Sequence, residues 1–158
     1  MFCPTAAEMT SQRMPLVLVA DDNQDAADSL AIALSFFGCE AVAVYDADDC
    51  LSMASALQPD VIVLDLHMPS MSGLDAALQL RLLPHQSHLI AVTGDASVEA
   101  AQRVKEVGFV AHWVKPIDPD KLANQIRELT ELTAVAPSGA ALHLWQEGLP
   151  SSSDLAGA

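Results

Sequence analysis

Five short apolar segments between residues 16 and 114 constrain the fold of this chain more than any other feature of its sequence. Residues 16–20, 61–64 and 89–92 are apolar throughout, residues 41–45 are a weaker version, and residues 110–114 are a fifth candidate. A continuous apolar run is typical of a parallel strand covered on both faces. Helical patterns lie between and after these runs, so we expect an α/β fold with one doubly wound parallel sheet and helices on both faces.

The expected helices are defined by apolar stripes at helical spacing. Gly38 and Gly108 are predicted to end the first and the fourth helix, and Pro84 to close the third. Ser97 is predicted to cap the fourth helix, and Asp118-Pro119 to start the fifth. The inward stripes are predicted to be Ala27, Leu30, Leu34 and Phe37; Leu51 and Ala54 within residues 48–57; Leu74, Leu78 and Leu82; Val98, Ala101 and Val104; and Leu122, Ile126 and Leu129.

The length of 158 residues suits one ordinary domain. We expect an N-terminal extension over residues 1–14, a domain over residues 15–132 and a flexible tail over residues 133–158, which is rich in Ala, Gly, Ser and Pro. Seven Lys and Arg against 21 Asp and Glu give a net charge of −14. This balance argues against partners that are nucleic acids or anionic membranes, because both are recognised by clustered cations.

The apolar runs, the first residues and the cysteines favour a reduced, cytoplasmic protein. No apolar run reaches the roughly 18 residues of a membrane span, and residues 1–15 lack the pattern of a signal peptide. The three cysteines form no C-x-x-C pair, so neither a disulfide framework nor a zinc site is expected.

Polar residues stand at the carboxyl ends of four predicted strands: Asp21-Asp22, Asp65, Thr93 and Lys115-Pro116. Each alone has an ordinary interpretation as a helix cap, a loop residue or a solvated charge. In a parallel α/β sheet, however, this edge is where ligands bind. Converging carboxylates repel one another unless a cation joins them. Oxygen ligands beside a lysine and a hydroxyl therefore predict a site for Mg²⁺ and a phosphoryl group.

These residues, in this order, resemble the receiver domain of two-component response regulators. The resemblance rests on Asp21-Asp22, the D-x-x-M-P-x-x-x-G stretch from Asp65 to Gly73, Thr93-Gly94 and Lys115-Pro116, and covers about residues 15–132. It implies a flavodoxin-like sheet in the order 2-1-3-4-5. It also implies a signalling module that accepts a phosphoryl group from a sensor histidine kinase or a histidine phosphotransfer protein and acts on an unknown downstream protein, rather than an enzyme acting on a metabolite.

The resemblance assigns a nucleophile and a metal site. Asp65 would be the phosphoacceptor, and its carboxylate would attack phosphorus. Asp22 would bind Mg²⁺ directly together with Asp65, while Asp21 would orient metal-bound waters. The backbone carbonyl of His67 would be the third protein ligand of the metal.

The resemblance also assigns the groups that contact the phosphoryl oxygens. Lys115, joined to the next proline by a cis peptide bond, would neutralise one oxygen, and the backbone N–H groups of Leu66 and Gly94 would donate to others. The Thr93 hydroxyl would move toward the phosphoryl group and act as the switch. The residue that would follow this movement, an aromatic in the family, is His112 here.

Three positions near this switch leave their roles open. The imidazole of His112 is interpreted first as a space-filling side chain and second as a pH-sensitive part of the switch. Comparing the phosphorylation-dependent change of His112→Phe at about pH 6 and pH 8 would separate the two interpretations. His67 and Asp95, two residues after Asp65 and Thr93, would tune dephosphorylation in a direction that the sequence does not reveal.

A partner surface is predicted on the first helix. If its apolar stripe faces the sheet, Ile32 and Phe36 point away from it, on the side of Asp25 and Asp28. Phosphotransfer domains bind the corresponding helix in the family that the chain resembles. We therefore expect Ile32 and Phe36 to contact the phosphohistidine donor.

Three other functions remain as alternatives. The chain is either a free-standing regulator or the receiver portion of a hybrid histidine kinase. An aspartyl-nucleophile phosphatase is disfavoured, because such enzymes carry a D-x-D motif and His67 stands at the second acid position. A degenerate receiver that acts without phosphorylation is disfavoured by the intact acids, Thr93 and Lys115.

Overall fold

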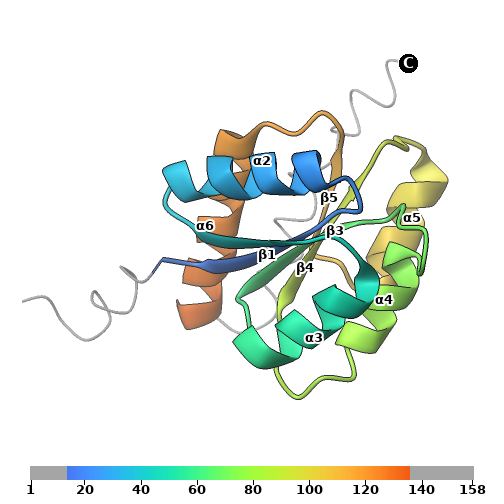
Figure 1. The fold of residues 1–158 in the computed structure, drawn as a ribbon, viewed down its shortest axis with the longest axis horizontal. Helices are drawn as coiled ribbons and strands as arrows, with labels where there is room; N and C mark the ends of the chain where they lie inside the picture. Colours follow the sequence, from blue (N-terminus) through green and yellow to red (C-terminus); the bar gives the residue numbers. More distant parts are fainter. Residues whose placement is uncertain (1–13, 136–158) are drawn as a thin grey trace, which may run out of the picture.

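The predicted strands form one parallel sheet in the order β2-β1-β3-β4-β5. The computed structural model describes residues 14–135, in which strands and helices alternate (Figure 1). The strands are β1 (Leu16–Ala20), β2 (Glu40–Val44), β3 (Val61–Asp65), β4 (His88–Thr93) and β5 (Ala111–Val114). The helices are α2 (Gln24–Phe36), α3 (Ala47–Leu57), α4 (Gly73–Leu80), α5 (Val98–Val107) and α6 (Pro119–Val135). The predicted doubly wound fold and strand order are confirmed.

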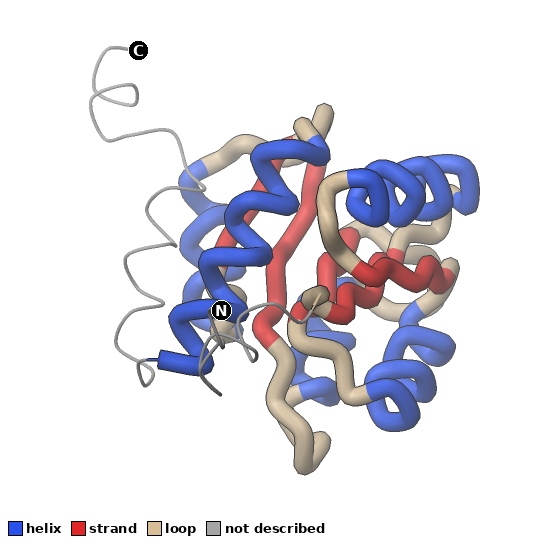
Figure 2. The backbone as a smooth tube through the Cα atoms, turned by 90° about the vertical axis from the view of Figure 1, so that its left-hand side faces the viewer, coloured by secondary structure: helices blue, strands red, loops and turns tan. Residues whose placement is uncertain are grey.

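The sheet is the middle of three layers. Helices α2 and α6 cover one face, and α3, α4 and α5 cover the other (Figures 1 and 2). Side chains alternate between the faces of a strand, so Val17 and Val19 of β1 pack on the side of α2 and α6, while Leu18 packs on the opposite side. The continuous apolar runs follow from this arrangement, because the inner strands β1, β3 and β4 have a buried core on each face.

The predicted stripe of α4 is confirmed for Leu74, which is partly buried against the core, and is wrong for Leu78 and Leu82. Leu78 is exposed, and Leu82, at 84% exposure, lies beyond the end of the helix. The buried face is instead formed by Ala76, Ala77 and Leu80. Leu78 lies on roughly the opposite side of the helix from Ala76 and Leu80, so its side chain faces solvent.

Two other stripe residues are also exposed. Phe37, expected to face the sheet, lies just after the last residue of α2 and is more than one third exposed. Val98 is the first residue of α5, whose buried positions are Ala100 and Val104. Both side chains stand at helix ends, where the stripe no longer lies over the sheet. The predicted burial of Leu122, Ile126 and Leu129 in α6 is confirmed.

Short polar side chains set where the helices begin. The side chains of Asn23, Asp46, Ser72 and Ser97 each accept a hydrogen bond from a backbone N–H in the first turn of α2, α3, α4 and α5. Such caps satisfy N–H groups that have no partner inside a helix. The cap at Asn23 has a functional consequence, because it starts α2 directly after the Asp21-Asp22 pair.

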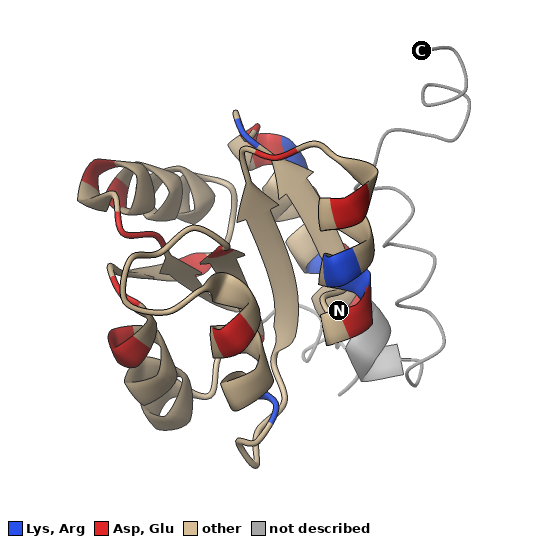
Figure 3. Ribbon diagram, turned by 90° about the vertical axis from the view of Figure 1, so that its right-hand side faces the viewer, with Lys and Arg blue, Asp and Glu red and all other residues tan. Residues whose placement is uncertain are grey.

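The last described helix, α6, extends into the expected tail. Helix α6 continues to Val135, three residues beyond the domain boundary expected at residue 132. The remainder of the expected tail and the N-terminal extension, residues 1–13, lie outside the described residues. Within residues 14–135, no helix combines the length and the apolar character needed to cross a bilayer. Acidic residues are more widespread than basic ones on this part of the chain (Figure 3).

Candidate functional site

The pairing of β1 with β3 brings the acidic segments together. Asp21 and Asp22 follow β1, and Asp65 is the last residue of β3. The two strands are adjacent and parallel, so their carboxyl ends share one edge of the sheet. One carboxylate oxygen from each of the three residues lies within 4.8 Å of the other two. Asp21 and Asp65 are buried, whereas Asp22 is exposed and forms the solvent side of the cluster.

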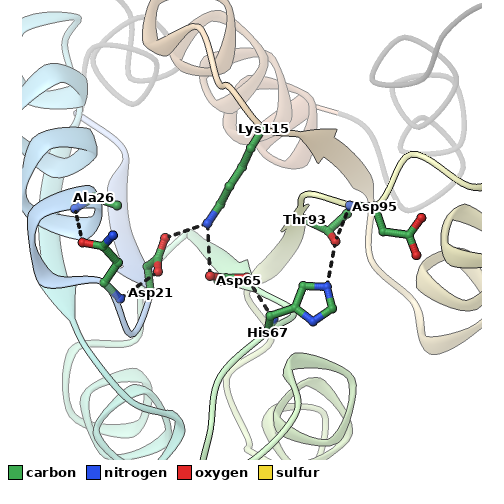
Figure 4. A network of polar contacts seen from close by, with 8 residues as sticks. Asp21, Ala26, Asp65, His67, Thr93, Asp95 and Lys115 are labelled. Carbon is green, nitrogen blue, oxygen red and sulfur yellow. Dashed lines mark hydrogen bonds and ion pairs between the residues drawn. The ribbon is translucent and has the colours of Figure 1, made fainter.

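Lys115 joins this cluster from the edge of the sheet. It follows β5, and its side chain extends toward β3 and β1 (Figure 4). Its Nζ lies 3.2 Å from Oδ2 of Asp21 and 3.2 Å from Oδ2 of Asp65. The peptide bond between Lys115 and Pro116 is cis, as expected. One ammonium group therefore bridges two carboxylates that come from different strands.

The electrostatics of the site follow from burial and from this bridge. Burial raises the pKa of Asp65 above its ordinary value; the His67 N–H and the Lys115 charge lower it, and the nearby Asp21 raises it. Partial burial lowers the pKa of Lys115, but the charges and hydrogen bonds of Asp65 and Asp21 outweigh this effect and raise it overall. A further cation would therefore favour the charged forms of these crowded carboxylates.

Backbone hydrogen bonds hold the carboxylates of Asp21 and Asp65 by the oxygen that does not face Lys115. Oδ1 of Asp21 accepts from the Asn23 N–H at 3.0 Å, and Oδ1 of Asp65 accepts from the His67 N–H at 2.9 Å. These local bonds leave the Oδ2 atoms of both residues directed at Lys115. The orientation of the two side chains is thus determined before any ligand binds.

The expectation for the Leu66 N–H is wrong. This group donates to the backbone oxygen of Val92 at 3.0 Å and so continues the ladder between β3 and β4. Successive N–H groups of an extended chain point in alternating directions. The N–H that reaches the Asp65 carboxylate is therefore that of His67. This alternation can be read from the sequence of a predicted strand, and it favours the His67 N–H over the Leu66 N–H.

The side chain of Thr93 lies on the other side of the site. We call the opening between Thr93, Asp65 and Lys115 at the carboxyl edge of the sheet the mouth. Thr93 ends β4 and is buried. Its Oγ1 accepts from the Asp95 N–H at 3.0 Å and lies 3.3 Å from Nε2 of His67 (Figure 4). Gly94, the next residue, has open space around the position where a Cβ would lie. Asp65, His67, Thr93 and Lys115 therefore surround one mouth at the carboxyl edge of the sheet.

His112 is buried in β5, one strand from this mouth. It pairs with Ala91 in the ladder and is 1% exposed, and neither ring nitrogen has a hydrogen-bond partner in the part of the chain that the structure describes. Burial lowers the pKa of His112, and the negative charge of Asp95 raises it to a smaller extent. A buried imidazole without partners is favoured in its neutral form. This geometry fits the space-filling interpretation, and the role of His112 in switching stays a prediction.

The lowered pKa of His112 predicts a loss of stability in acid. The unfolded chain binds a proton at the ordinary imidazole pKa, whereas folded His112 binds it only at lower pH, so the free energy of unfolding should fall as the pH drops below about 6.5. Urea titrations between about pH 8 and pH 5 should show a shallower fall for His112→Phe than for the parent. Part of the fall should remain, because burial also lowers the pKa of His88. Identical slopes for the two chains would contradict the prediction.

The fold and the site together define a class of protein. The class is a doubly wound α/β module with an acidic mouth that is bridged by a lysine and offers oxygen ligands to a hard cation. The response regulator receiver domain matches residues 17–127, and the chain belongs to this family.

Individual relatives agree with this assignment. The response regulator protein TodT of Pseudomonas putida is 28% identical over 145 residues, which cover 87% of this chain and 61% of TodT. The CAI-1 autoinducer sensor kinase/phosphatase CqsS of Vibrio cholerae is 33% identical over 113 residues, covering 70% of this chain and 16% of CqsS. The receiver domain of Francisella response regulator 1452 superposes with a TM-score of 0.71 at 26% identity, over 75% of this chain and 98% of that domain. The chain thus spans only part of the curated relatives that it matches.

Proposed function

We propose that this chain accepts a phosphoryl group on Asp65 from a phosphohistidine and transmits the change by protein contact. The observation that carries the proposal is the bridge from Lys115 to Asp65 and Asp21 at a mouth that also holds Thr93. A buried carboxylate beside a fixed cation and a hydroxyl is suited to covalent attack on phosphorus and to stabilisation of the transferred oxygens.

The transfer step is a displacement at phosphorus. An oxygen of the Asp65 carboxylate forms a bond to phosphorus while the bond from phosphorus to the donor imidazole nitrogen breaks. The imidazole nitrogen keeps the electron pair, and the product on this chain is an acyl phosphate. Lys115 would move its contact from the carboxylate to a phosphoryl oxygen, and the N–H groups of His67 and Gly94 would donate to others. Positioning and charge stabilisation supply most of the catalysis of such transfers.

Magnesium fits the acidic cluster. Asp21, Asp22 and Asp65 offer only oxygen ligands, which Mg²⁺ prefers, and the exposed position of Asp22 leaves room for water and a phosphoryl oxygen. In the proposal Asp22, Asp65 and the backbone carbonyl of His67 hold the ion and Asp21 orients its waters. The bound ion would offset negative charge on the phosphoryl oxygens.

Labelling by a small phosphodonor tests the proposal. Incubation with acetyl phosphate in Mg²⁺ should add one phosphoryl group per chain, detectable by intact mass. A folded chain that remains unmodified in Mg²⁺ would overturn the proposal. Slow self-catalysed gain and loss of this group, rather than turnover of a metabolite, is the activity that we propose.

The response to phosphorylation would begin at Thr93. We propose that its hydroxyl moves toward the phosphoryl oxygens and that His112, in the adjacent strand β5, adjusts to the space it leaves. The change would alter the surface formed by α5, β5 and α6, where an unknown downstream protein binds.

A cytoplasmic location is part of the proposal and is supported by the buried free thiols of Cys39 and Cys50, which suit a reducing compartment.

The donor would dock along α2. This helix starts two residues after Asp22, so a donor whose phosphohistidine reaches Asp65 would lie beside α2. The expected exposure of Ile32 (58%) and Phe36 (83%) is confirmed. They lie on the same side of α2 as Asp28, which accepts a hydrogen bond from the Tyr45 hydroxyl. We propose that the helical phosphotransfer surface of a histidine kinase or a histidine phosphotransfer protein covers this pair.

Phe36→Glu should separate docking from chemistry. A buried charge in the interface should slow transfer from the cognate phosphohistidine protein by about tenfold or more, because truncating an interface anchor costs about 1–2 kcal/mol and often more. The rate with acetyl phosphate should not change, since Phe36 is far from the reacting atoms along α2. Leu82→Glu, which alters an equally exposed apolar side chain next to α4, is the matched control and should affect neither rate. Unchanged transfer to Phe36→Glu would contradict this docking site.

The match to CqsS keeps one alternative open. That relative is a sensor kinase/phosphatase, and the chain spans 16% of it. A receiver within a hybrid kinase would use the same Asp65 chemistry, but its donor would belong to the same polypeptide.

A further inference from the structure

We infer that His67 is a positioning residue that holds the Thr93 hydroxyl in its unphosphorylated place. The inference rests on the proposed function, because it concerns the barrier that the phosphoryl group must overcome to engage Thr93. It goes beyond the proposal by giving the imidazole side chain of His67 a role separate from its backbone carbonyl and N–H.

The contact that carries the inference joins the loop after β3 to the end of β4. His67 follows β3 and Thr93 ends β4, and Nε2 of the imidazole lies 3.3 Å from Oγ1 of Thr93 (Figure 4). Thr93 is 1% exposed, whereas His67 is exposed. The imidazole therefore covers the solvent side of the hydroxyl, and replacing His67 changes a surface residue without opening a core.

After the bond from Asp95, the Thr93 hydroxyl has one proton and one lone pair left for its contact with His67, and we infer that it uses the proton. The Asp95 N–H donates to Oγ1 at 3.0 Å, so one lone pair of the oxygen is already occupied. A threonine hydroxyl has a single proton to donate. We assign that proton to Nε2 of His67, which requires the neutral tautomer with its proton on Nδ1. The proton is then withheld from the mouth, where a phosphoryl oxygen would need it.

The consequence is a bias between two positions of Thr93. Phosphorylation must exchange the bond to His67 for a bond to a phosphoryl oxygen. Loss of the imidazole should therefore raise the population of chains whose hydroxyl is free to engage the phosphoryl group. One hydrogen bond within a protein has a net worth that corresponds to about a two- to tenfold change in such a population. We expect a change of that size in the rate of phosphorylation.

The tautomer is measured without any phosphodonor. In the full chain labelled with ¹⁵N-histidine at about pH 8, where a free imidazole is neutral, the signals of His67 are assigned by their absence from His67→Gln. The expected result is a protonated Nδ1 and an unprotonated Nε2, and a return toward the ordinary Nε2–H tautomer in Thr93→Val. A protonated Nε2 in the parent, or no change in Thr93→Val, would overturn the inference.

Rates with acetyl phosphate in Mg²⁺ provide the second readout. His67→Phe keeps a ring but has no acceptor, and should be phosphorylated about two- to tenfold faster than the parent. His67→Gln keeps an acceptor on a side chain of similar reach, and should restore the parent rate. His85→Phe is the matched control, because it removes an imidazole that contacts the Pro59 oxygen outside the mouth. Equal rates for Phe and Gln at position 67 would overturn the inference.

Removal of the Thr93 hydroxyl tests whether His67 acts through that hydroxyl or directly on the donor and the mouth. In the Thr93→Val background, Phe and Gln at position 67 should give equal rates, because the hydroxyl through which His67 acts is gone. A difference that persists would show that His67 acts on the donor or the mouth directly and would overturn the inference. A parent chain that takes up no phosphoryl group would instead refute the proposed function, and the tautomer measurement would still decide whether His67 holds Thr93.

Discussion

Asp65→Asn should reduce labelling by acetyl phosphate to the background of the assay. The amide has the shape of the carboxylate but is not a nucleophile, so no bond to phosphorus forms. The fold should persist, because the substitution keeps the volume of a buried side chain and Asp21 still pairs with Lys115 at 3.2 Å. Intact mass and circular dichroism together check both parts of the prediction.

Magnesium removal should produce a similar loss in the parent chain. Chelation with EDTA leaves the Asp21, Asp22 and Asp65 carboxylates to repel an incoming phosphoryl group. Asp120→Asn is the matched control for Asp65→Asn. It alters an exposed carboxylate in the first turn of α6, and the variant should be labelled like the parent. Full labelling of Asp65→Asn would place the acceptor elsewhere, and labelling that is insensitive to EDTA would argue against a metal at the cluster.

Gly73→Ala should give the largest loss of stability among single-atom additions near the site. A Cβ at position 73 would lie 2.6 Å from the backbone oxygen of Asp65 and 2.7 Å from Cα of Leu66. Backbone atoms cannot rotate away, so the loop and the end of β3 must shift. Overpacking of this kind typically costs up to about 3 kcal/mol, and we expect roughly 2–3 kcal/mol in the free energy of unfolding. Urea denaturation measures it.

The same substitution should slow phosphorylation, because the shifted atoms belong to the phosphoacceptor. Gly94→Ala is the stability control, since no atom lies within 4 Å of the Cβ that it adds. Its unfolding midpoint should stay close to that of the parent. Equal midpoints for Gly73→Ala and Gly94→Ala would show that the close approach of α4 to β3 does not constrain position 73.

The predicted site agrees with the structure where it depends on strand ends. Asp21, Asp65 and Lys115 were expected to converge, and they form the two ion pairs at the mouth. This expectation needs only the order of the strands, because parallel strands end at a common edge. The direction of the Leu66 N–H was predicted wrongly, because successive N–H groups alternate in direction along β3 and this one donates to β4.

The predicted helix faces also agree with the structure in one helix and differ from it in another. In α6, large apolar residues recur at helical spacing and are buried as predicted. In α4, the small residues Ala76 and Ala77 take the buried face and Leu78 is left exposed. Hydrophobicity alone ranks leucine above alanine, but the packing of the helix against the sheet decides which of its sides is buried.

By itself, the sequence determined the alternation of strands and helices, the layered sheet and the order of the acids, the hydroxyl and the lysine along its edge. These features follow from local apolar patterns, because a strand between two helical layers must be apolar on both faces. Only the tertiary structure decided that one ammonium group bridges Asp21 and Asp65, and that the imidazole of His67 meets the hydroxyl of Thr93. Such contacts depend on strand register and side-chain rotamers, which are set when distant segments pack together.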